Sequence, residues 1–295
     1  MARRRVTVKT EKIRVSVHEH FKSLNDLITV MENRPFNKAF QNEENPSSQR
    51  DESKKDFPWS GTKTYSDAME IIRKGYYEPL ERMKKAILNI GRKEENSRPK
   101  LKNDFVGFVP HVPHTIMNLP ITMINKEKRP NKPKTIHLLY NFSASAKTTP
   151  DEMVQGGINF ISLVNSLEKQ GYSVKIDMIS SFGTDRTLSS MTVNVKEYGQ
   201  KLNLLKLTFP LVHPSMLRRI SFKWLETTPE LKDREFTLGY GIPLQHLMRY
   251  DLESESNYLK AMKVIRGENT FYCNMDTAIK SKSPDDLAQK IGITK

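Results

Sequence analysis

The centre of the chain has the order strand, helix, strand in its pattern of apolar and polar positions. Apolar runs predict strands over 136–142 and 174–179. Between them, apolar residues spaced three and four apart form a stripe over 150–170, which predicts a long helix. A right-handed crossover would set the two strands parallel, so the pattern predicts a βαβ unit within an α/β fold.

The start of this helix carries a full set of N-terminal signals. Thr149 stands at the N-cap position, Pro150 at the first helical position, and Glu152 where a capping box needs an acidic side chain. Gly156 and Gly157 lie inside the helix, where each costs about 1 kcal/mol relative to alanine. We therefore expect the helix to pack closely on the sheet at these two glycines.

Other periodic segments surround the βαβ unit. Helical spacing predicts further helices over 21–31, 65–74, 78–90, 214–225, 257–265 and 284–291. Alternation and apolar runs predict further strands over 6–17, 191–198, 202–209, 236–242 and 270–275. Because a Gly-Gln-Lys turn separates the strands over 191–198 and 202–209, we expect these two to form a hairpin.

Two segments lack a regular pattern. Residues 41–55 are polar and aperiodic, which predicts a disordered linker. Residues 107–120 contain three prolines, so we expect an extended connection without a helix there. His111 and His114 lie in this second segment, and no acidic or cysteine residue adjoins them to complete a metal site.

These patterns predict three regions. Residues 1–56 form a basic N-terminal extension with a short strand, a helix and the polar linker. Residues 57–104 form a helical hairpin region, and residues 105–295 form the α/β domain.

Composition narrows the class of protein. The hydrophobic fraction is 37%, and no apolar run approaches the roughly 18 residues of a membrane span. The first residues also lack the apolar core of a secretory signal. We therefore expect an intracellular protein without a membrane partner. Cys273 is the single cysteine, which excludes an internal disulfide and a cysteine-cluster metal site.

Positive charge is concentrated in two short segments. Of the net charge of +14, residues 1–14 and 126–134 together carry nine charges. Such clusters attract phosphate backbones, so nucleic acid is one expected partner, and a solvated tail and linker is the alternative interpretation. The residues expected to contact nucleic acid are Arg3, Arg4, Arg5, Lys9, Lys126, Lys128, Arg129, Lys132 and Lys134.

Small polar side chains follow the first strand of the βαβ unit. Asn141, Ser143 and Ser145 lie where ligands bind in open α/β sheets, beyond the carboxyl ends of the strands. Their spacing resembles the Asp-x-Ser-x-Ser motif of von Willebrand factor A domains. That resemblance implies a three-layer Rossmann-like fold and a site for Mg²⁺ or Mn²⁺, with Asp276 as a further ligand from a later loop. Asn141 replaces the leading aspartate and removes a charge that a hard cation needs. We expect a degenerate site, and a functioning one is the alternative.

A wider resemblance covers roughly residues 57–280. The ordered motifs are Trp59-x-Gly61, Gly75-Tyr76, Gly107 to Pro113, Leu119 to Met123 and Leu167 to Gly171. As a set they resemble an uncharacterised family of bacteriophage proteins with a domain of unknown function. The resemblance implies a viral origin, and it implies no mechanism.

The sequence predicts no catalytic residues. Ser143 and Ser145 lie outside a Gly-x-Ser-x-Gly motif, and no histidine is tied to them by spacing. His137 and Cys273 fall inside predicted strands, where a structural role is expected. We predict a non-enzymatic phage binding or assembly protein of the host cytoplasm or the virion, with a protein partner at the sheet-end crevice. The alternatives are a cation-dependent adhesion module and a hydrolase, and the sequence predicts no oligomeric state.

Overall fold

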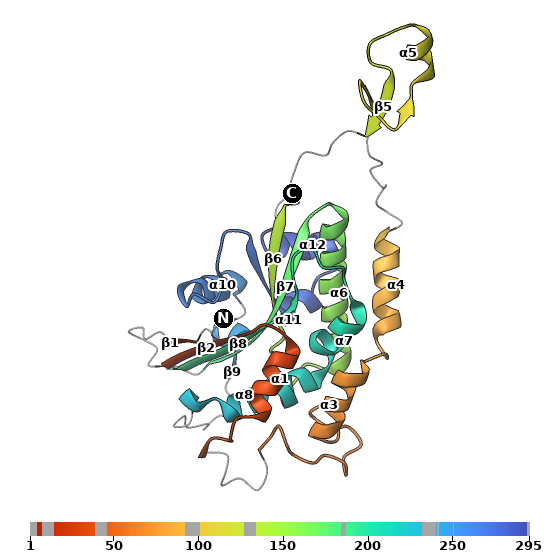
Figure 1. The fold of residues 1–295 in the computed structure, drawn as a ribbon. Helices are drawn as coiled ribbons and strands as arrows, with labels where there is room; N and C mark the ends of the chain where they lie inside the picture. Colours follow the sequence, from red (N-terminus) through yellow and green to blue (C-terminus); the bar gives the residue numbers. More distant parts are fainter. Residues whose placement is uncertain are drawn as a thin grey trace.

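The computed structural model describes residues 5–7, 15–38, 46–91, 101–126, 134–183, 187–231, 240, 242–249 and 251–293. In these residues the chain forms a main α/β body and a small unit of residues 101–126, which lies apart from the main sheet (Figure 1). The predicted α/β class is therefore confirmed.

The main sheet is mixed and has the strand order β1-β2-β8-β7-β6-β10, with β9 paired to the end of β7. Its strands are β1 (Arg5–Thr7), β2 (Val15–Phe21), β6 (Thr135–Asn141), β7 (Ser173–Gly183), β8 (Thr187–Lys196), β9 (Ile242–Pro243) and β10 (Thr270–Asn274). Strand β6 is parallel to both of its neighbours, β7 and β10. Strand β8 is antiparallel to β7 and parallel to β2, and β1 is antiparallel to β2.

Helices cover both faces of this sheet. The helices of the body are α1 (Leu24–Glu32), α3 (Tyr65–Lys74), α4 (Leu80–Gly91), α6 (Pro150–Lys169), α7 (Leu204–Val212), the π-helical η1 (Met216–Ser221), α8 (Phe222–Thr227), the 3₁₀ turn η2 (Pro229–Leu231), α9 (Leu244–Leu247), α10 (Leu252–Ala261), α11 (Met275–Ile279) and α12 (Pro284–Lys290). Among the described residues, none of these helices is both long enough and apolar enough to cross a membrane.

Alternation along β6 divides the core in two. Leu138 and Tyr140 point into a large cluster built with α6, α7, α8, α11 and α12. Leu139 points to the other face, where α9 and α10 contribute Leu244 and Leu259 to a smaller cluster. The sheet is therefore buried between helices on both sides, as parallel strands require.

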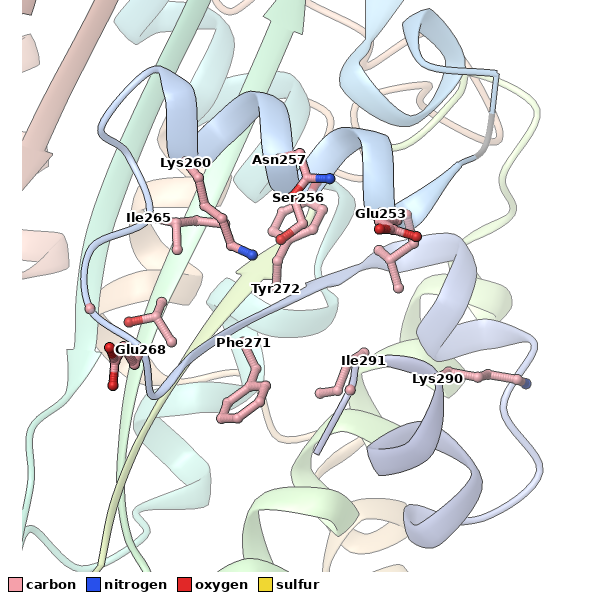
Figure 2. Close-up of a pocket in the computed structure, with 14 residues that line it drawn as sticks. Glu253, Ser256, Asn257, Lys260, Ile265, Glu268, Phe271, Tyr272, Lys290 and Ile291 are labelled. Atoms are coloured by element: carbon pink, nitrogen blue, oxygen red, sulfur yellow. The ribbon is translucent and has the colours of Figure 1, made fainter. Parts of the chain in front are cut away.

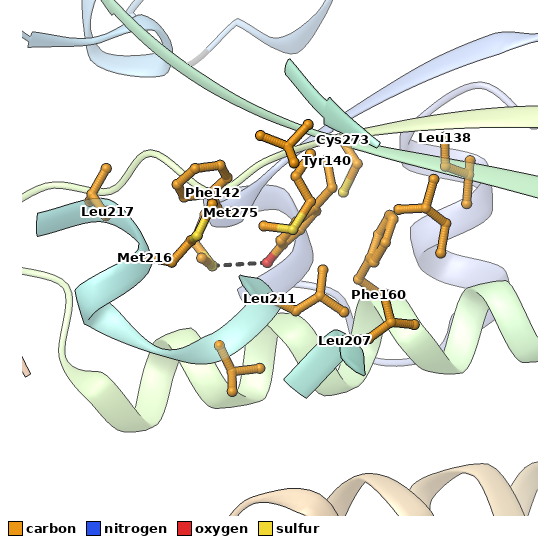
Figure 3. Close-up of a cluster of buried hydrophobic side chains, with 14 of the residues drawn as sticks. Leu138, Tyr140, Phe142, Phe160, Leu207, Leu211, Met216, Leu217, Cys273 and Met275 are labelled. Carbon is orange, nitrogen blue, oxygen red and sulfur yellow. Dashed lines mark hydrogen bonds between the residues drawn. The ribbon is translucent and has the colours of Figure 1, made fainter. Parts of the chain in front are cut away.

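Tyr140 lies at the centre of the larger cluster (Figure 3). Its ring stacks on Phe160 with centroids 4.4 Å apart, and its hydroxyl donates to the Met275 sulfur at 3.1 Å. These contacts tie β6 to α6 and to the first turn of α11. Because β6 is thus fixed to two helices, the residues at its carboxyl end have a rigid support.

The predicted βαβ unit is confirmed. Strands β6 and β7 pair in parallel, and α6 connects them. The capping box of Thr149 and Glu152 is formed in both directions. The two helix glycines are closely packed as expected. Gly156 faces Met275 and Ile279 of α11 and also the hydroxyl of Tyr140 in β6, whereas Gly157 faces α7. A Cβ on Gly157 would lie 2.2 Å from the Val212 Cγ1 atom of α7.

One predicted strand is wrong. Residues 202–209 were expected to pair with 191–198, but most of them lie in α7, and the antiparallel partner of β8 is β7. Asn203 caps the helix by accepting from the Lys206 backbone N–H at 3.2 Å. An apolar run buried on all sides does not distinguish a strand from a buried helix, so the apolar pattern misled the prediction.

The predicted disordered linker over 41–55 is also wrong from residue 46 onward, and its first five residues lie outside the described ones. The buried guanidinium of Arg219 donates to the backbone carbonyls of Ser48 (3.0 Å), Arg50 (2.7 Å) and Thr62 (2.7 Å). Ser48 also donates to the Glu226 carboxylate, from its backbone N–H (3.0 Å) and from its hydroxyl. A polar segment is therefore held against the body by residues that are remote in the sequence, which composition does not reveal.

The small unit contains β3 (Leu101–Asp104), β4 (Val109–Pro110), α5 (Val112–Ile116) and β5 (Met123–Lys126). Its strands form an antiparallel sheet in the order β3-β5-β4. The expectation of no helix over 107–120 is wrong. Pro113 lies in the first turn of α5, where its missing N–H is not needed, and His111 caps the helix.

The two sheets join segments that the sequence assigned to different regions. The main sheet contains β2, from the predicted N-terminal extension, and β6, from the predicted α/β domain. The small unit spans the predicted boundary between 104 and 105. The strand predicted over 236–242 lies almost wholly outside the described residues.

Candidate functional site at the ends of strands β6 and β10

Strand β6 lies between β7 and β10 in the main sheet and is parallel to both. Helix α6 leads from β6 to β7 (Figure 1), and α11 follows directly after β10. In open α/β sheets, ligands bind beyond the carboxyl ends of the strands. Asn141 ends β6 and Asn274 ends β10, and the two residues are paired in register.

Asn141 is fully buried and its side chain is hydrogen-bonded on both sides. Its Oδ1 accepts from the Ser143 backbone N–H at 2.9 Å. Its Nδ2 donates to the Ser181 hydroxyl at 2.9 Å and to the Tyr272 hydroxyl at 2.7 Å. The amide thus joins three strands, β6, β7 and β10, at their carboxyl ends.

Ser143 is also fully buried. Its hydroxyl accepts from the Ser181 backbone N–H at 2.9 Å and lies 3.3 Å from the Ser180 hydroxyl. Ser180 in turn lies 2.6 Å from the Ser221 hydroxyl of η1. The Ser143 carbonyl accepts from the Gln245 amide at 2.6 Å. These hydroxyls therefore form an internal chain from the end of β6 to the π-helical turn.

On the β10 side, the network ends at a buried carboxyl group, Glu255 of α10. Asn274 Nδ2 lies 3.1 and 2.9 Å from its two oxygens, and the Tyr272 hydroxyl also hydrogen-bonds to it. Burial raises the pKa of Glu255 from 4.5 to about 7. The hydrogen bonds from Asn274 and Tyr272 act to lower this pKa, and the charges of Asp276 and Asp251 act to raise it. This carboxyl group therefore gains or loses a proton near neutral pH.

Sequence reasoning found Asn141 and Ser143 in this network, and it missed Glu255, Tyr272 and Gln245. A signal existed for Tyr272, because it lies in the predicted strand over 270–275 on the face opposite Cys273. No signal existed for Glu255, because an acidic residue in a charged helix is typical of a solvent-exposed face.

Ser145 and Asp276 lie beside this network and are not hydrogen-bonded to Asn141 or Ser143 within the described residues. The half-exposed Ser145 accepts from the Lys147 backbone N–H at 3.3 Å, as in a turn. Asp276 is half-buried in the first turn of α11. The four residues predicted as metal ligands thus share one end of the sheet, and only the first two are brought together.

These side chains do not fit a divalent cation in this arrangement. A hard cation needs oxygen ligands that are free to turn toward it. The Asn141 Oδ1 and the Ser143 hydroxyl already accept backbone N–H groups. Within the described ranges, no three His, Cys, Asp or Glu side chains come together as a metal would require. The degenerate site, and the functioning Mg²⁺ or Mn²⁺ site that is its alternative, both stay predictions.

A cavity of about 700 Å³ lies next to the network, between α10, the outer edge of β10 and α12 (Figure 2). Ile265, Phe271 and Ile291 supply apolar surface, and Lys260 and Glu268 lie at its rim. Tyr272 lines the cavity and also contacts Asn141, so it connects the cavity with the buried network.

The histidines of the sheet have structural partners. His18 Nδ1 lies 2.9 Å from the Ser190 hydroxyl, and both residues are buried, so a substrate has no access to this pair. Burial lowers the pKa of His18 to about 4. His137 Nε2 lies 2.9 Å from Asp177. Burial also raises the pKa of the Cys273 thiol, which keeps it protonated.

Most residues expected to contact nucleic acid lie outside the described ones, namely Arg3, Arg4, Lys9, Lys128, Arg129 and Lys132. For Arg5 in β1 and Lys126 in β5, the backbone alone is described. Lys134 is exposed, and its carbonyl accepts from the Ser173 backbone N–H at 2.8 Å. Nucleic-acid binding by these residues stays a prediction.

Comparison with known proteins gives a family match without an activity. Residues 5–279 match the model of a family described as a domain of unknown function, DUF7192. No curated protein and no solved structure matches the chain. The match agrees with the predicted uncharacterised family.

Proposed function

The chain belongs to the DUF7192 family, and we propose that it is a non-enzymatic binding protein that docks onto a partner protein through residues 101–126. We call these residues the projecting unit. The α/β body serves as its scaffold. The observation that carries the proposal is the exposure of large apolar side chains on this unit.

Nine large apolar side chains are exposed on the projecting unit: Leu101, Phe105, Val106, Phe108, Val109, Val112, Ile116, Met117 and Leu119. The exposed fraction reaches 79% at Ile116 and 75% at Val106. Among the described side chains of the unit, none is buried. Large exposed apolar side chains that gather on one small unit mark a candidate interaction site.

The size of the unit supports the same conclusion. A segment of fewer than roughly 40 residues rarely buries enough surface to fold without disulfides, metals or a partner. The unit is shorter than this limit and lies apart from the main sheet (Figure 1). A partner protein with an apolar groove would supply the core that the unit lacks. Residues such as Phe105 and Ile116 would then be the anchors of the interface.

The ends of β6 and β10 offer less to a partner. Asn141 and Ser143 are fully buried, and their polar atoms hydrogen-bond within the chain. We therefore assign partner contact to the projecting unit and a supporting role to the sheet-end network. The buried network joins β6, β7 and β10 within the body.

We also propose that the body is of von Willebrand A type and that the protein is viral. The strand order β8-β7-β6-β10 supports the first proposal, because one antiparallel strand follows a parallel βαβ unit. The position of Asp276 after β10 is consistent with it. The viral origin rests on the ordered motifs over 57–280.

Nucleic acid is a second candidate partner, favoured by the nine net positive charges of residues 1–14 and 126–134. Retention on DNA and RNA across a salt series tests it. Binding at low salt that weakens when Arg4, Arg5, Lys128 and Arg129 are changed to alanine supports this candidate. The absence of binding at low salt rejects it.

Affinity capture tests the main proposal. The wild-type chain is compared with a triple variant of the unit, Phe105→Ser, Val112→Ser and Ile116→Ser. The control triple variant, Phe57→Ser, Tyr77→Ser and Leu88→Ser, changes large side chains of the body that are also exposed. We expect a stoichiometric partner with the wild type and the control, and no partner with the unit variant. Equal capture by all three chains would reject the proposal.

A further inference from the structure

The sheet of the projecting unit has two edges, and one of them is open. Strand β4 is two residues long and ends in Pro110, which has no N–H to donate to a further strand. Strand β3 has four residues, and within the described part of the chain no strand pairs with its outer edge. An exposed edge of this kind is a template for pairing with another strand.

The hydrogen bonds of β5 show which way its residues face. The Thr122 carbonyl accepts from His111 N–H at 2.7 Å, so it faces β4. Neighbouring residues of an antiparallel strand direct their backbone groups to opposite sides. Ile124 therefore also faces β4, and Met123 and Asn125 face β3 on the other side.

The register between β3 and β5 then gives the free groups of β3. Lys102 is paired with Asn125 and Asp104 with Met123, so the backbone groups of Lys102 and Asp104 bond to β5. The backbone N–H and C=O of Asn103, between them, point outward. Leu101, two positions earlier in β3, shares this outward direction. Phe105 follows the end of β3, and its N–H donates to Asp104 Oδ1 at 2.8 Å.

We propose that β3 pairs with β3 of a second copy of this chain, antiparallel and about a two-fold axis at Asn103. The two Asn103 residues then face each other as a hydrogen-bonded pair. Lys102 of each copy faces Asp104 of the other, and Leu101 faces Phe105. When two copies of residues 101–105 run antiparallel in this register, side chains of opposite charge face each other and apolar side chains face each other.

This register is the one that both hydrogen bonding and charge allow. An axis at Lys102 would set that lysine against its own copy, and an axis at Asp104 would do the same for two aspartates. Like charges directly opposite each other destabilise a sheet. If the two-fold axis passed between two residues, backbone groups that point outward would lie opposite backbone groups that point toward β5. Such groups do not hydrogen-bond to each other. Lys102 Nζ and Asp104 Oδ2 lie 3.0 Å apart within one chain, so both charges are already on one face of β3.

The pairing also covers apolar surface. Leu101 is 60% exposed and Phe105 is 68% exposed, and each would face the other across the axis. The two small sheets become one continuous sheet with a closed interface between identical surfaces, as in a two-fold dimer. This inference goes beyond the proposed docking, because it requires no other protein. A dimer would present two projecting units to a partner.

Sedimentation of the full-length chain over a concentration series is the first test. The proposal predicts a mass that rises with concentration from the 34.1 kDa of one chain toward twice that value. A single-chain mass at every concentration would overturn it.

Charge reversal tests the register. Lys102→Asp leaves two negative side chains on the strand, and Asp104→Lys leaves two positive ones. Each variant alone is expected to lose about tenfold or more in dimer affinity, because like charges then face each other. An equal mixture of the two variants is expected to form a mixed dimer, since every facing pair is again of opposite sign. The control Lys147→Asp, at an exposed loop position, keeps wild-type dimerisation. Dimerisation of the single variants at wild-type strength, or a monomeric mixture, would overturn the register.

A cysteine at the axis gives a second readout. Facing residues of a hydrogen-bonded antiparallel pair have Cα atoms about 5.5 Å apart, which is within the range of a disulfide. Asn103→Cys is therefore expected to give a covalent dimer on mild oxidation. Lys147→Cys, the control, is expected to form no covalent dimer, and the natural Cys273 is buried. Failure of Asn103→Cys to cross-link would overturn the proposed axis.

Docking through the projecting unit and pairing through β3 can be rejected independently of each other. The charge variants keep every apolar side chain of the unit, so a monomeric Lys102→Asp chain that still captures a partner would leave the docking function standing. A chain that dimerises through β3 and captures no partner would support the pairing and reject the docking.

Discussion

The Tyr272 hydroxyl accepts a hydrogen bond from Asn141 Nδ2 at 2.7 Å and connects the end of β6 to the carboxyl group of Glu255. Three strands and α10 thus meet in one buried polar network. A network of this kind is stable only when each member has its partners. Glu255 is the member of the network that is most sensitive to pH, because burial disfavours the charged form of its carboxyl group.

Stability should depend on pH through Glu255. Its pKa is raised from 4.5 to about 7 in the folded chain, so the folded state binds the proton more tightly than the unfolded state. The stabilisation is fully present below pH 4.5 and is lost as the pH rises through 7. It amounts to at most about 3 kcal/mol. We expect the free energy of unfolding of the wild type, relative to Glu255→Gln, to fall between pH 5 and 8. Parallel pH profiles from urea titrations would contradict this assignment.

Gly157→Ala should destabilise the fold. The added Cβ would lie 2.2 Å from Val212 Cγ1, so the Val212 side chain or the helix α7 that carries it must shift. Overpacking of this kind costs about 1–3 kcal/mol, which exceeds the gain of about 1 kcal/mol in helix propensity. Thermal unfolding measures the loss. The double variant with Val212→Ala is expected to recover part of it, and no recovery would argue against a steric cause.

Arg219→Lys should release the segment of residues 46–63 from the body. A lysine keeps the charge but not the planar fork that donates to the Ser48, Arg50 and Thr62 carbonyls. The expected cost is on the order of 3 kcal/mol, because several buried acceptors lose their partners. Amide hydrogen exchange should accelerate in this segment and not in α6. Unchanged protection of the segment would contradict the assigned role of Arg219.

Mg²⁺ and Mn²⁺ should leave the melting temperature of the protein unchanged. The oxygens of Asn141 and Ser143 already accept backbone hydrogen bonds, so a cation would have to displace them. The measurement is thermal unfolding across a titration of each cation. A saturable increase that Ser143→Ala removes would establish a functioning metal site and reject the degenerate one.

Local signals predicted the βαβ unit well. Thr149, Pro150 and Glu152 define the start of α6 by chemistry that needs no distant partner. The position of Asn141 at the end of a strand followed from the same pattern. The environment of Asn141 did not follow from it, because the residues that hydrogen-bond to its side-chain amide, Ser181 and Tyr272, lie far away in the sequence.

Long-range contacts account for the failed predictions. Residues from 46 onward were expected to be disordered because their partner, Arg219, belongs to a helix that follows much later. The helix α7 was taken for a strand because its surface is buried on several sides. The projecting unit escaped prediction because its sheet depends on pairing of β5 with two strands across a proline-rich segment.

Binding of the purified partner, once captured, is the most direct test of the docking claim. Isothermal titration would compare the wild type with the triple variant Phe105→Ser, Val112→Ser and Ile116→Ser. Buried apolar anchors each contribute more than about 1 kcal/mol, so the variant should bind about 100-fold more weakly or worse. The control triple variant in the body, at Phe57, Tyr77 and Leu88, should bind like the wild type. Wild-type affinity of the unit variant would contradict the claim that residues 101–126 are the docking surface.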